Sequence, residues 1–210
     1  MRVPPSQKNP SEITTRDGHC ADNPSRKDQL YRDEIHLIAQ KHFWRLKGLP
    51  TPHKLKYDNG NDFDSLIRGW VRYWNEVLKP KKLLDPDIVK ALIATESGFN
   101  PTSWNKMKGS RAAYGLMQVL KPTISYLKEE SNELKDHFIT LDQNDLNDPN
   151  LNICAGVRWL FRKKEIAEAR LKKLLSWREA VCEYKGYKIK DKNQKGMKNF
   201  DEKFNKLKIY

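Results

Sequence analysis

Long apolar runs and an apolar leader segment are both missing from this sequence. A membrane-spanning helix needs about 20 consecutive apolar residues, and no segment of the chain offers them. The first residues, MRVPPSQKNP, have no apolar core of the kind that defines a secretory signal. We therefore expect no membrane span, and either retention inside the cell or export by a route without a cleaved signal. A chain whose signal had been removed would look the same.

Cysteine is scarce, and histidine occurs without the partners that would make it a metal ligand. The three cysteines are odd in number and far apart, which is not the pattern of a disulfide framework. Cys154 and Cys182 lie among apolar residues and are predicted to be small core side chains, whereas Cys20 lies in a polar stretch and is expected to be a free thiol. The five histidines show no zinc-site spacing with cysteine, so we expect no metal site and no cofactor.

Acidic residues are too few to balance the basic ones. Lys and Arg total 40 against 27 for Asp and Glu, which gives a formal net charge of +13. Such an excess suits an anionic polymeric partner: a nucleic acid, an acidic membrane surface or an acidic cell wall. The sequence contains no recognised nucleic-acid-binding motif and its basic residues are spread along the chain, so a nucleic acid is not the expected partner.

What the sequence does contain is helical periodicity, and this predicts a mainly α fold. Apolar residues at steps of three and four predict helices over about 28–47, 63–78, 85–96, 122–130, 148–161 and 176–184. Residues 131–147 are polar and are predicted to form a loop, and no strand-rich region or internal repeat is present. The aromatic stripe in 63–78, which includes Trp70 and Trp74, is interpreted as core rather than as a binding face.

Composition divides the chain into four parts. Residues 1–27, rich in Pro, Ser, Asp and Lys, are predicted to be an irregular N-terminal arm. Residues 28–84 are predicted to be a helical region packed on a core at 85–187, and residues 188–210 to be a basic C-terminal tail. Apolar residues keep helical spacing within the tail, which leaves two alternatives open, a docked amphipathic helix or a solvated charged segment.

Glu96 ends the apolar helix predicted at 85–96. It lies four residues after Leu92 and so shares the apolar face, and Gly98 and Pro101 end the helix just beyond it. An ionised carboxylate in such a place is costly unless it is paired or works as an acid. Two interpretations follow: Glu96 is a general acid, or it lies in solvent on a frayed last turn.

Four motifs occur in order along the chain. They are ESGFNP at 96–101, YGLMQVLKPT at 114–123, DPNLNICAGVRWL at 148–160 and AVCEYKGY at 180–187. Together they resemble the soluble lytic transglycosylase (SLT) family of peptidoglycan-cleaving enzymes, which is related to goose-type lysozymes. The resemblance covers about residues 85–187 and implies a lysozyme-like fold, to which this chain adds N-terminal helices and the basic tail.

The resemblance also implies a role for individual residues. It implies that Glu96 is the single catalytic acid and base, that Ser97 forms a hydrogen bond near the reacting sugar and that Tyr184 holds the glutamate. The chain departs from the family pattern just after Tyr184, because Lys185-Gly186 stands where the family has Asn-Ala-Gly. The residues implied to line the glycan cleft, the last two of them in contact with substrate, are Gly115, Leu116, Met117 and Gln118.

The activity implied is non-hydrolytic cleavage of the β-1,4 bond between N-acetylmuramic acid and N-acetylglucosamine, which leaves 1,6-anhydromuramic ends. Hydrolases of glycosidic bonds usually need two carboxylates. Here no acidic residue occurs from Ser97 through Lys128, and Leu120 stands where a hydrolase of this fold carries one. A hydrolytic muramidase is the alternative, with its second carboxylate supplied from elsewhere in the chain by Asp142, Asp145 or Glu183. A nucleic-acid binder and a non-catalytic wall-binding protein are further alternatives.

The resemblance implies peptidoglycan glycan strands as the partner and action in the periplasm or cell wall. Delivery without a signal fits a phage lysis enzyme or an effector exported by a specialised secretion system, and an exported effector would have an immunity or inhibitor protein. We expect the protein to be a monomer.

Overall fold

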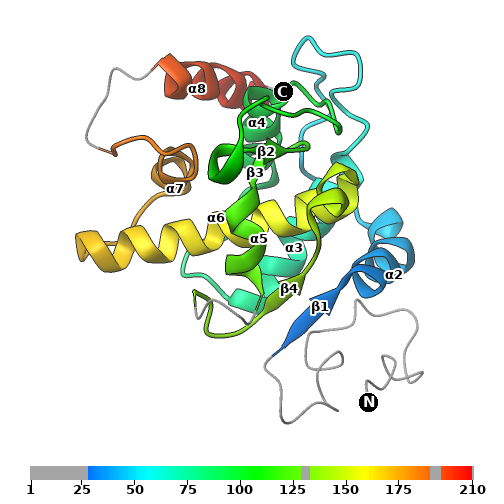
Figure 1. Cartoon of the computed structure of the whole chain (residues 1–210). Coiled ribbons are helices and arrows are strands. Elements are labelled where there is room, and N and C mark those ends of the chain that lie inside the picture. Colours follow the sequence, from blue (N-terminus) through cyan, green and yellow to red (C-terminus); the bar gives the residue numbers. More distant parts are fainter. Residues whose placement is uncertain (1–27, 129–132, 190–194, 210) are drawn as a thin grey trace.

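The computed structural model describes residues 28–128, 133–189 and 195–209, so the predicted arm at 1–27 and Cys20 lie outside the described residues. The prediction of a mainly α fold is confirmed, since seven α-helices and four very short strands make up the described part (Figure 1). None of these helices has the length and hydropathy that a bilayer-spanning helix requires. The helices are α2 (Arg32–His42), α3 (Asp64–Leu78), α4 (Pro86–Glu96), α5 (Lys121–Leu127), α6 (Pro149–Leu171), α7 (Trp177–Tyr184) and α8 (Lys195–Lys208).

Helix α4 is the central element, and its ends follow from local chemistry. The Asp85 side chain accepts a hydrogen bond from the Asp87 N–H at 2.9 Å, and Pro86 occupies the first turn, where its missing N–H costs nothing. Gly98, with φ of +59°, takes the left-handed conformation that ends the helix. Every residue from Asp87 to Ala94 is buried, because α3, α7 and α8 pack around the helix.

Helices α3 and α6 form the rest of the core. Trp70 and Trp74 are fully buried, so the interpretation of the aromatic stripe as core is confirmed. Their indole N–H groups donate to Asn150 Oδ1 at 2.7 Å and to the Cys154 carbonyl at 3.1 Å, both on α6. Cys154 and Cys182 are buried, as predicted. Helix α6 runs ten residues beyond the predicted end at 161. The prediction stopped early because this extension is largely polar, and of its residues only Ala167 is buried.

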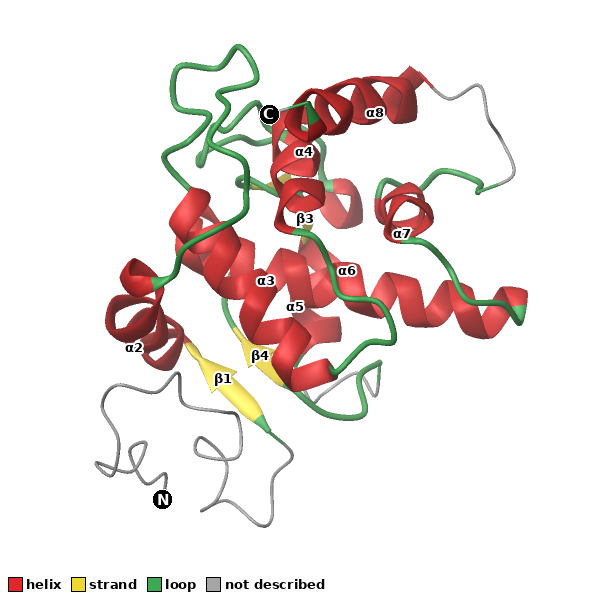
Figure 2. Ribbon diagram, turned by 180° about the vertical axis from the view of Figure 1, so that it is seen from behind, coloured by secondary structure: helices red, strands yellow, loops and turns green. Residues whose placement is uncertain are grey.

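Two predictions of local structure are wrong, and both concern the same strand pair. The predicted helix at 28–47 begins as strand β1 (Gln29–Tyr31), and the predicted loop at 131–147 contains strand β4 (Phe138–Thr140) and the 3₁₀ helix η4 (Gln143–Asn147). β1 and β4 pair in parallel beside α2, at the end of the molecule opposite α8 (Figure 2). Three-residue strands carry too little periodicity to be recognised, and pairing across about a hundred residues leaves no local trace.

A buried polar network joins α4 to Thr51 and to the first residue of α3, Asp64. The fully buried Lys90 ammonium donates to Asp64 Oδ2 at 2.9 Å and to the Thr51 carbonyl at 2.8 Å. The buried Asp87 carboxylate accepts from the Thr51 N–H at 2.7 Å and from its hydroxyl at 3.0 Å. Burial lowers the pKa of Lys90 and raises the pKa of Asp64, and their mutual hydrogen bond opposes both shifts. The two charges are therefore kept inside by pairing.

Helix α8 settles the two alternatives for the tail in favour of a docked amphipathic helix. Met197, Phe200 and Leu207 are buried against the core, and α8 packs along α4 (Figure 1). The Arg178 guanidinium on α7 forms a two-point contact with the Asp201 carboxylate, at 2.7 and 2.6 Å. The lysines of α8 mostly face outward, so the helix is amphipathic and structural.

Replacing Phe200 by alanine should therefore lower the free energy of unfolding by about 3–5 kcal/mol, because a fully buried ring is removed from a packed contact. Lys198→Ala, on the exposed face of the same helix, is the matched control and should change it by less than about 0.5 kcal/mol. Urea unfolding followed by tryptophan fluorescence measures both. A Phe200→Ala effect as small as that of the control would mean that α8 is not docked in solution.

Candidate active site

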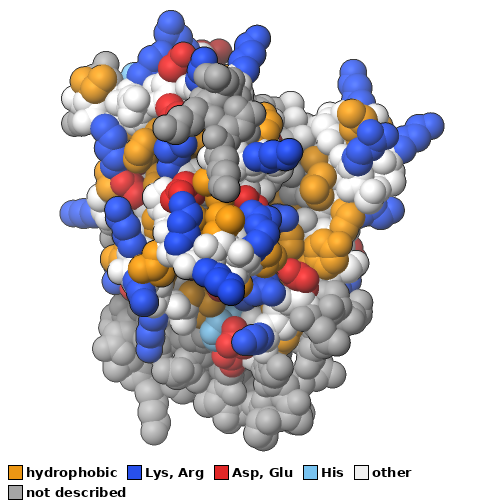
Figure 3. Space-filling model, turned by 90° about the vertical axis from the view of Figure 1, so that its left-hand side faces the viewer, with side chains coloured by type: hydrophobic (Ala, Val, Ile, Leu, Met, Phe, Trp, Pro, Cys, Tyr) orange, Lys and Arg blue, Asp and Glu red, His pale blue; other side chains and the backbone are white. Residues whose placement is uncertain are grey.

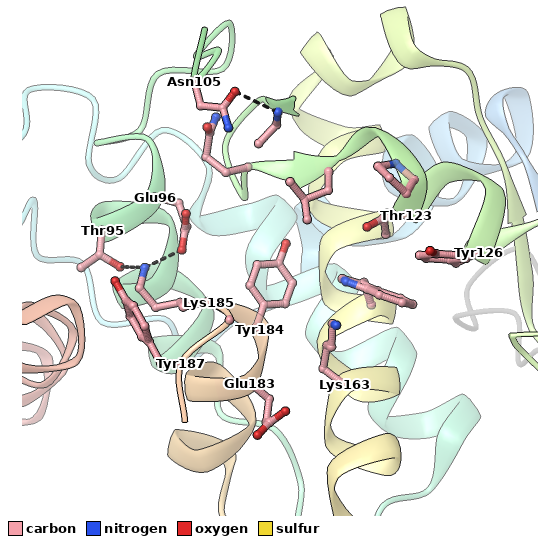
Figure 4. Close-up of a pocket in the computed structure, with 16 residues that line it drawn as sticks. Thr95, Glu96, Asn105, Thr123, Tyr126, Lys163, Glu183, Tyr184, Lys185 and Tyr187 are labelled. Atoms are coloured by element: carbon pink, nitrogen blue, oxygen red, sulfur yellow. Dashed lines mark hydrogen bonds and ion pairs between the residues drawn. The ribbon is translucent and has the colours of Figure 1, made fainter. Parts of the chain in front are cut away.

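A cleft of about 550 Å³ opens at the C-terminal end of α4 (Figure 4). Its walls come from six parts of the chain: the end of α4, the loop that follows it, the β2–β3 hairpin (Ala113–Tyr114 and Val119–Leu120), α5, α6, and the end of α7 with the residues after it. The cleft therefore lies where the four motif segments quoted above meet. The described residues that line it are Thr95, Glu96, Asn105, Ala113, Gln118, Leu120, Pro122, Thr123, Tyr126, Trp159, Lys163, Glu183, Tyr184, Lys185, Gly186 and Tyr187.

Glu96 lies on the cleft wall as the last residue of α4, with a side chain that is 18% exposed. Its carboxylate is therefore partly buried rather than free in solvent on a frayed turn. Its Oε1 accepts a hydrogen bond from the Lys185 ammonium, whose side chain is 7% exposed (Figure 4). The sequence left open whether this carboxylate would be paired. The structure pairs it with a lysine 89 residues away.

The turn from Gly115 to Gln118 lies next to the end of α4, where Ser97 bonds its backbone. Gly115 has φ of +73°, and a Cβ there would lie 2.2 Å from the Asn152 amide nitrogen, so only glycine fits. Leu116 and Met117 are fully buried, and neither is among the described residues that line the cleft. The Met117 side chain instead lies on Gly156 of α6. Of the four cleft residues implied by the resemblance, only Gln118 reaches the wall.

Ser97 and Tyr184 use their hydroxyl groups to hold this turn. Ser97 Oγ donates to the Leu116 carbonyl at 2.8 Å, and the Tyr184 hydroxyl donates to the Met117 carbonyl at 2.8 Å. Burial first, and then the charge of Glu96, raises the pKa of Tyr184, which keeps the phenol protonated as a donor. The resemblance implied that Tyr184 holds Glu96. In this structure the contact with the carboxylate is made by Lys185.

Asn152 is a site residue that the sequence reasoning did not single out. It is fully buried on α6, its Oδ1 accepts from the Met117 N–H at 2.8 Å, and its Nδ2 donates to the carbonyls of Tyr114 and Leu146 at 2.9 and 2.8 Å. One amide therefore fixes the turn, the hairpin and η4 together. The available signal was a polar residue on the apolar face of the segment DPNLNICAGVRWL.

An aromatic wall stands across the cleft from α4 and was also missed. The Tyr126 ring on α5 stacks on Trp159 of α6, with ring centroids 5.6 Å apart, and the Lys163 ammonium lies 5.0 Å from the Trp159 ring. All three residues line the cleft (Figure 4). A flat aromatic surface with a cation beside it suits an uncharged sugar ring joined to an anionic group.

Comparison with known protein families identifies the chain. Residues 73–206, more than half of it, match the transglycosylase SLT domain. The chain belongs to the SLT transglycosylase family. The match runs from within α3 into α8 and so includes every described residue that lines the cleft, and it is wider than the predicted 85–187. No curated protein and no solved structure matches the chain.

Membership of the SLT family implies a lysozyme-like fold and a glycan-cleaving transglycosylase that acts on peptidoglycan. The cleft has two paired carboxylates in its wall, Glu96 with Lys185 and Glu183 with Arg170. Within the described ranges, no group of three or more His, Cys, Asp or Glu side chains is arranged to hold a metal ion.

The other acidic residues considered for this SLT transglycosylase lie in different places. The Asp142 side chain is 88% exposed and lies near Lys128, and the Asp145 carboxylate pairs with Arg32 at 3.2 Å. Neither residue is among the described residues that line the cleft. Glu183 does line the cleft, but it points away from Glu96 (Figure 4). The Arg170 guanidinium holds its carboxylate at 2.6 Å.

Replacing Asn152 by alanine should lower both the stability and the turnover of the enzyme. The substitution leaves one N–H and two carbonyls without their partner, which should cost about 2–4 kcal/mol in the free energy of unfolding. Asn150→Ala is the matched control, since Asn150 lies on the same helix but bonds Trp70 instead of the turn. Both variants should be less stable, but only Asn152→Ala should lower kcat for the folded protein. Equal kcat values in the two variants would contradict this role.

Proposed function

We propose that this SLT transglycosylase cleaves the β-1,4 bond between N-acetylmuramic acid and N-acetylglucosamine without water, leaving 1,6-anhydromuramic ends, with Glu96 as its single acid and base. The observation that carries the proposal is the set of carboxylates in the cleft. The acidic residues that line the described cleft are Glu96 and Glu183, and Glu183 is held by Arg170. One carboxylate is enough for a reaction in which the substrate supplies its own nucleophile.

The proposed reaction has two proton transfers at one carboxyl group. Glu96, protonated, donates to the glycosidic oxygen as positive charge develops at C1 of the muramyl sugar. The resulting carboxylate then accepts the proton of the muramyl 6-hydroxyl, whose oxygen closes on C1. The proton given to the leaving group is thus recovered from the nucleophile, and no water is consumed. The 6-hydroxyl has the advantage of being held in place, which is worth effective molarities of about 10⁵–10⁸ M in well-oriented cases.

The charge of the protein supports an anionic polymeric substrate. The chain carries +13, and Lys163 lies in the cleft wall itself. On the face drawn in Figure 3, basic side chains are spread over the described surface and are not gathered in one band. A spread of basic charge suits attraction to the many peptide carboxylates of peptidoglycan. Nucleic-acid binders typically carry a contiguous basic stripe instead. The proposed place of action is accordingly the periplasm or cell wall.

Hydrolysis is the second candidate, and Glu183 is the observation that favours it. A hydrolase needs a second carboxylate positioned to activate water or to attack the sugar. Glu183 lines the same cleft and would serve only if it left Arg170 and turned towards Glu96. The two functions are separated by which glutamate the reaction requires and by whether water enters the product.

Glu96→Gln should lower the rate of muropeptide release from purified sacculi by about 10²–10⁴-fold, because an amide cannot protonate the leaving oxygen. Sacculus binding should stay nearly unchanged. The matched variant Glu183→Gln should lose less than threefold. Activity of Glu96→Gln within twofold of the wild type would remove Glu96 from the mechanism, whereas loss in both variants would favour the hydrolase.

Digestion in heavy-oxygen water should leave no label at the new muramyl ends. The ends should carry the 1,6-anhydro ring, which is lighter than the hydrolysed end by one water. Mass spectrometry of the released muropeptides measures both features in one experiment. Stoichiometric label at reducing muramic ends would make the protein a lysozyme.

A further inference from the structure

Lys185 is held firmly in the cleft wall although it follows the last residue of α7. Its N–H donates to the Val181 carbonyl at 3.0 Å, and Gly186, with φ of +73°, turns the chain away directly after it. The side chain is 7% exposed. Its ammonium contacts Glu96 Oε1 and Thr95 Oγ1, the latter at 3.2 Å, and Thr95 in turn donates to the Leu92 carbonyl at 3.0 Å. Both partners therefore belong to the last turn of α4.

This placement raises a chemical problem for a general acid. An ammonium ion next to a carboxyl group favours the ionised form of that group. A carboxylate cannot donate a proton to a glycosidic oxygen, so Glu96 needs a proton source if it is to act as the acid, and the Lys185 ammonium is in contact with its Oε1.

We propose that Lys185 is a positioning residue that stores the catalytic proton: it holds Glu96 ionised in the free protein and passes a proton to it when a glycan strand covers the pair. The inference rests on the proposed role of Glu96 as the acid. In the transfer an N–H bond of the Lys185 ammonium breaks and an O–H bond forms on Glu96. The pair changes from ammonium and carboxylate to amine and carboxylic acid, with no proton taken from or lost to solvent.

Desolvation supplies the driving force. The two side chains are already 7% and 18% exposed, so the water that still stabilises their charges enters from the open cleft. A bound strand excludes that water, and removing water from two charges is costly, whereas a neutral amine and acid are penalised far less. After Glu96 has donated its proton and recovered another from the 6-hydroxyl, product release readmits water and restores the ion pair.

The remaining titratable groups of the described cleft have other partners or lie on other walls. Lys163 on α6 lies over the Trp159 ring, Glu183 on α7 pairs with Arg170, and the Tyr184 hydroxyl donates to the Met117 carbonyl. Two further titratable residues line the cleft: Tyr126 on α5, which stacks on Trp159, and Tyr187, which follows Gly186. The Lys185 ammonium donates to Glu96 Oε1 and to Thr95 Oγ1.

Two substitutions separate a proton store from a structural ion pair. Lys185→Arg keeps the positive charge, but a guanidinium does not release its proton in the usable pH range. Lys185→Met keeps the length of the side chain and leaves Glu96 to take its proton from solvent. A structural ion pair would make the arginine variant the milder of the two. If Lys185 stores the proton, Lys185→Arg should lose more activity than Lys185→Met, and the activity of Lys185→Met should depend on pH differently from that of the wild type.

The measurement is kcat/KM for muropeptide release from sacculi as a function of pH, expressed as the ratio of variant to wild type so that ionisation of the substrate cancels. Lys185→Arg should be at least about 100-fold slower at every pH. Lys185→Met should approach the wild type at the acidic end, and its ratio should fall by about tenfold per pH unit on the alkaline side, following the protonated fraction of a lone carboxyl group. Lys198→Met, on the exposed face of α8, should match the wild type throughout.

Two outcomes would overturn the proposal: Lys185→Arg within threefold of the wild type, or a Lys185→Met ratio that does not change with pH. Should Lys185→Met fail to bind sacculi as the folded wild type does, Lys185→Asn, which restores the side chain of the family pattern, is measured in its place against the same criteria. Product analysis runs on the wild type in parallel. If the wild type released reducing muramic ends, the proposed transglycosylation would be refuted. The comparison of the Lys185 variants would still test the inference, because Glu96 would then be the acid of a hydrolase.

Discussion

The burial of α4 on every side is the constraint on which the rest of this structure depends. A helix with no exposed face from Asp87 to Ala94 must be enclosed, and α3, α7 and α8 enclose it. The last two residues of the helix, Thr95 and Glu96, are partly exposed, and both line the cleft. The catalytic candidate is thus carried by a helix that is enclosed by its neighbours, which suits a group that must be held within a fraction of an ångström of its target.

Enclosing α4 brings charged groups inside, and the fold pairs each of them. Lys90 and Asp87 are fully buried and are matched by Asp64 and Thr51, which come from the region before the core. Breaking such a buried pair typically costs about 3–5 kcal/mol. The segment before residue 85 therefore supplies polar partners for α4 as well as apolar side chains that pack against it. The SLT match itself begins inside α3.

Several polar side chains at the cleft form hydrogen bonds to the protein's own backbone. Ser97, Asn152 and Tyr184 point their polar atoms at the backbone of the Gly115–Gln118 turn. Their hydrogen bonds fix the wall beside Glu96 and leave Gln118 on the surface of the cleft. Polar side chains near a reacting carboxylate thus act largely through the shape that they maintain. Family motifs reveal that such residues matter without revealing which way they point.

The sequence by itself determined the helices with strong periodicity, the core role of Trp70 and Trp74, and the place of Glu96 at the end of α4, because each depends on residues within a few turns of one another. It did not determine the β1–β4 pair or the burial of Leu116 and Met117, which depend on distant segments. The partner of Glu96 is the sharpest case: Lys185 lies 89 residues away and meets it only because α7 packs beside α4. The pairing of the candidate acid is therefore a property of the tertiary structure.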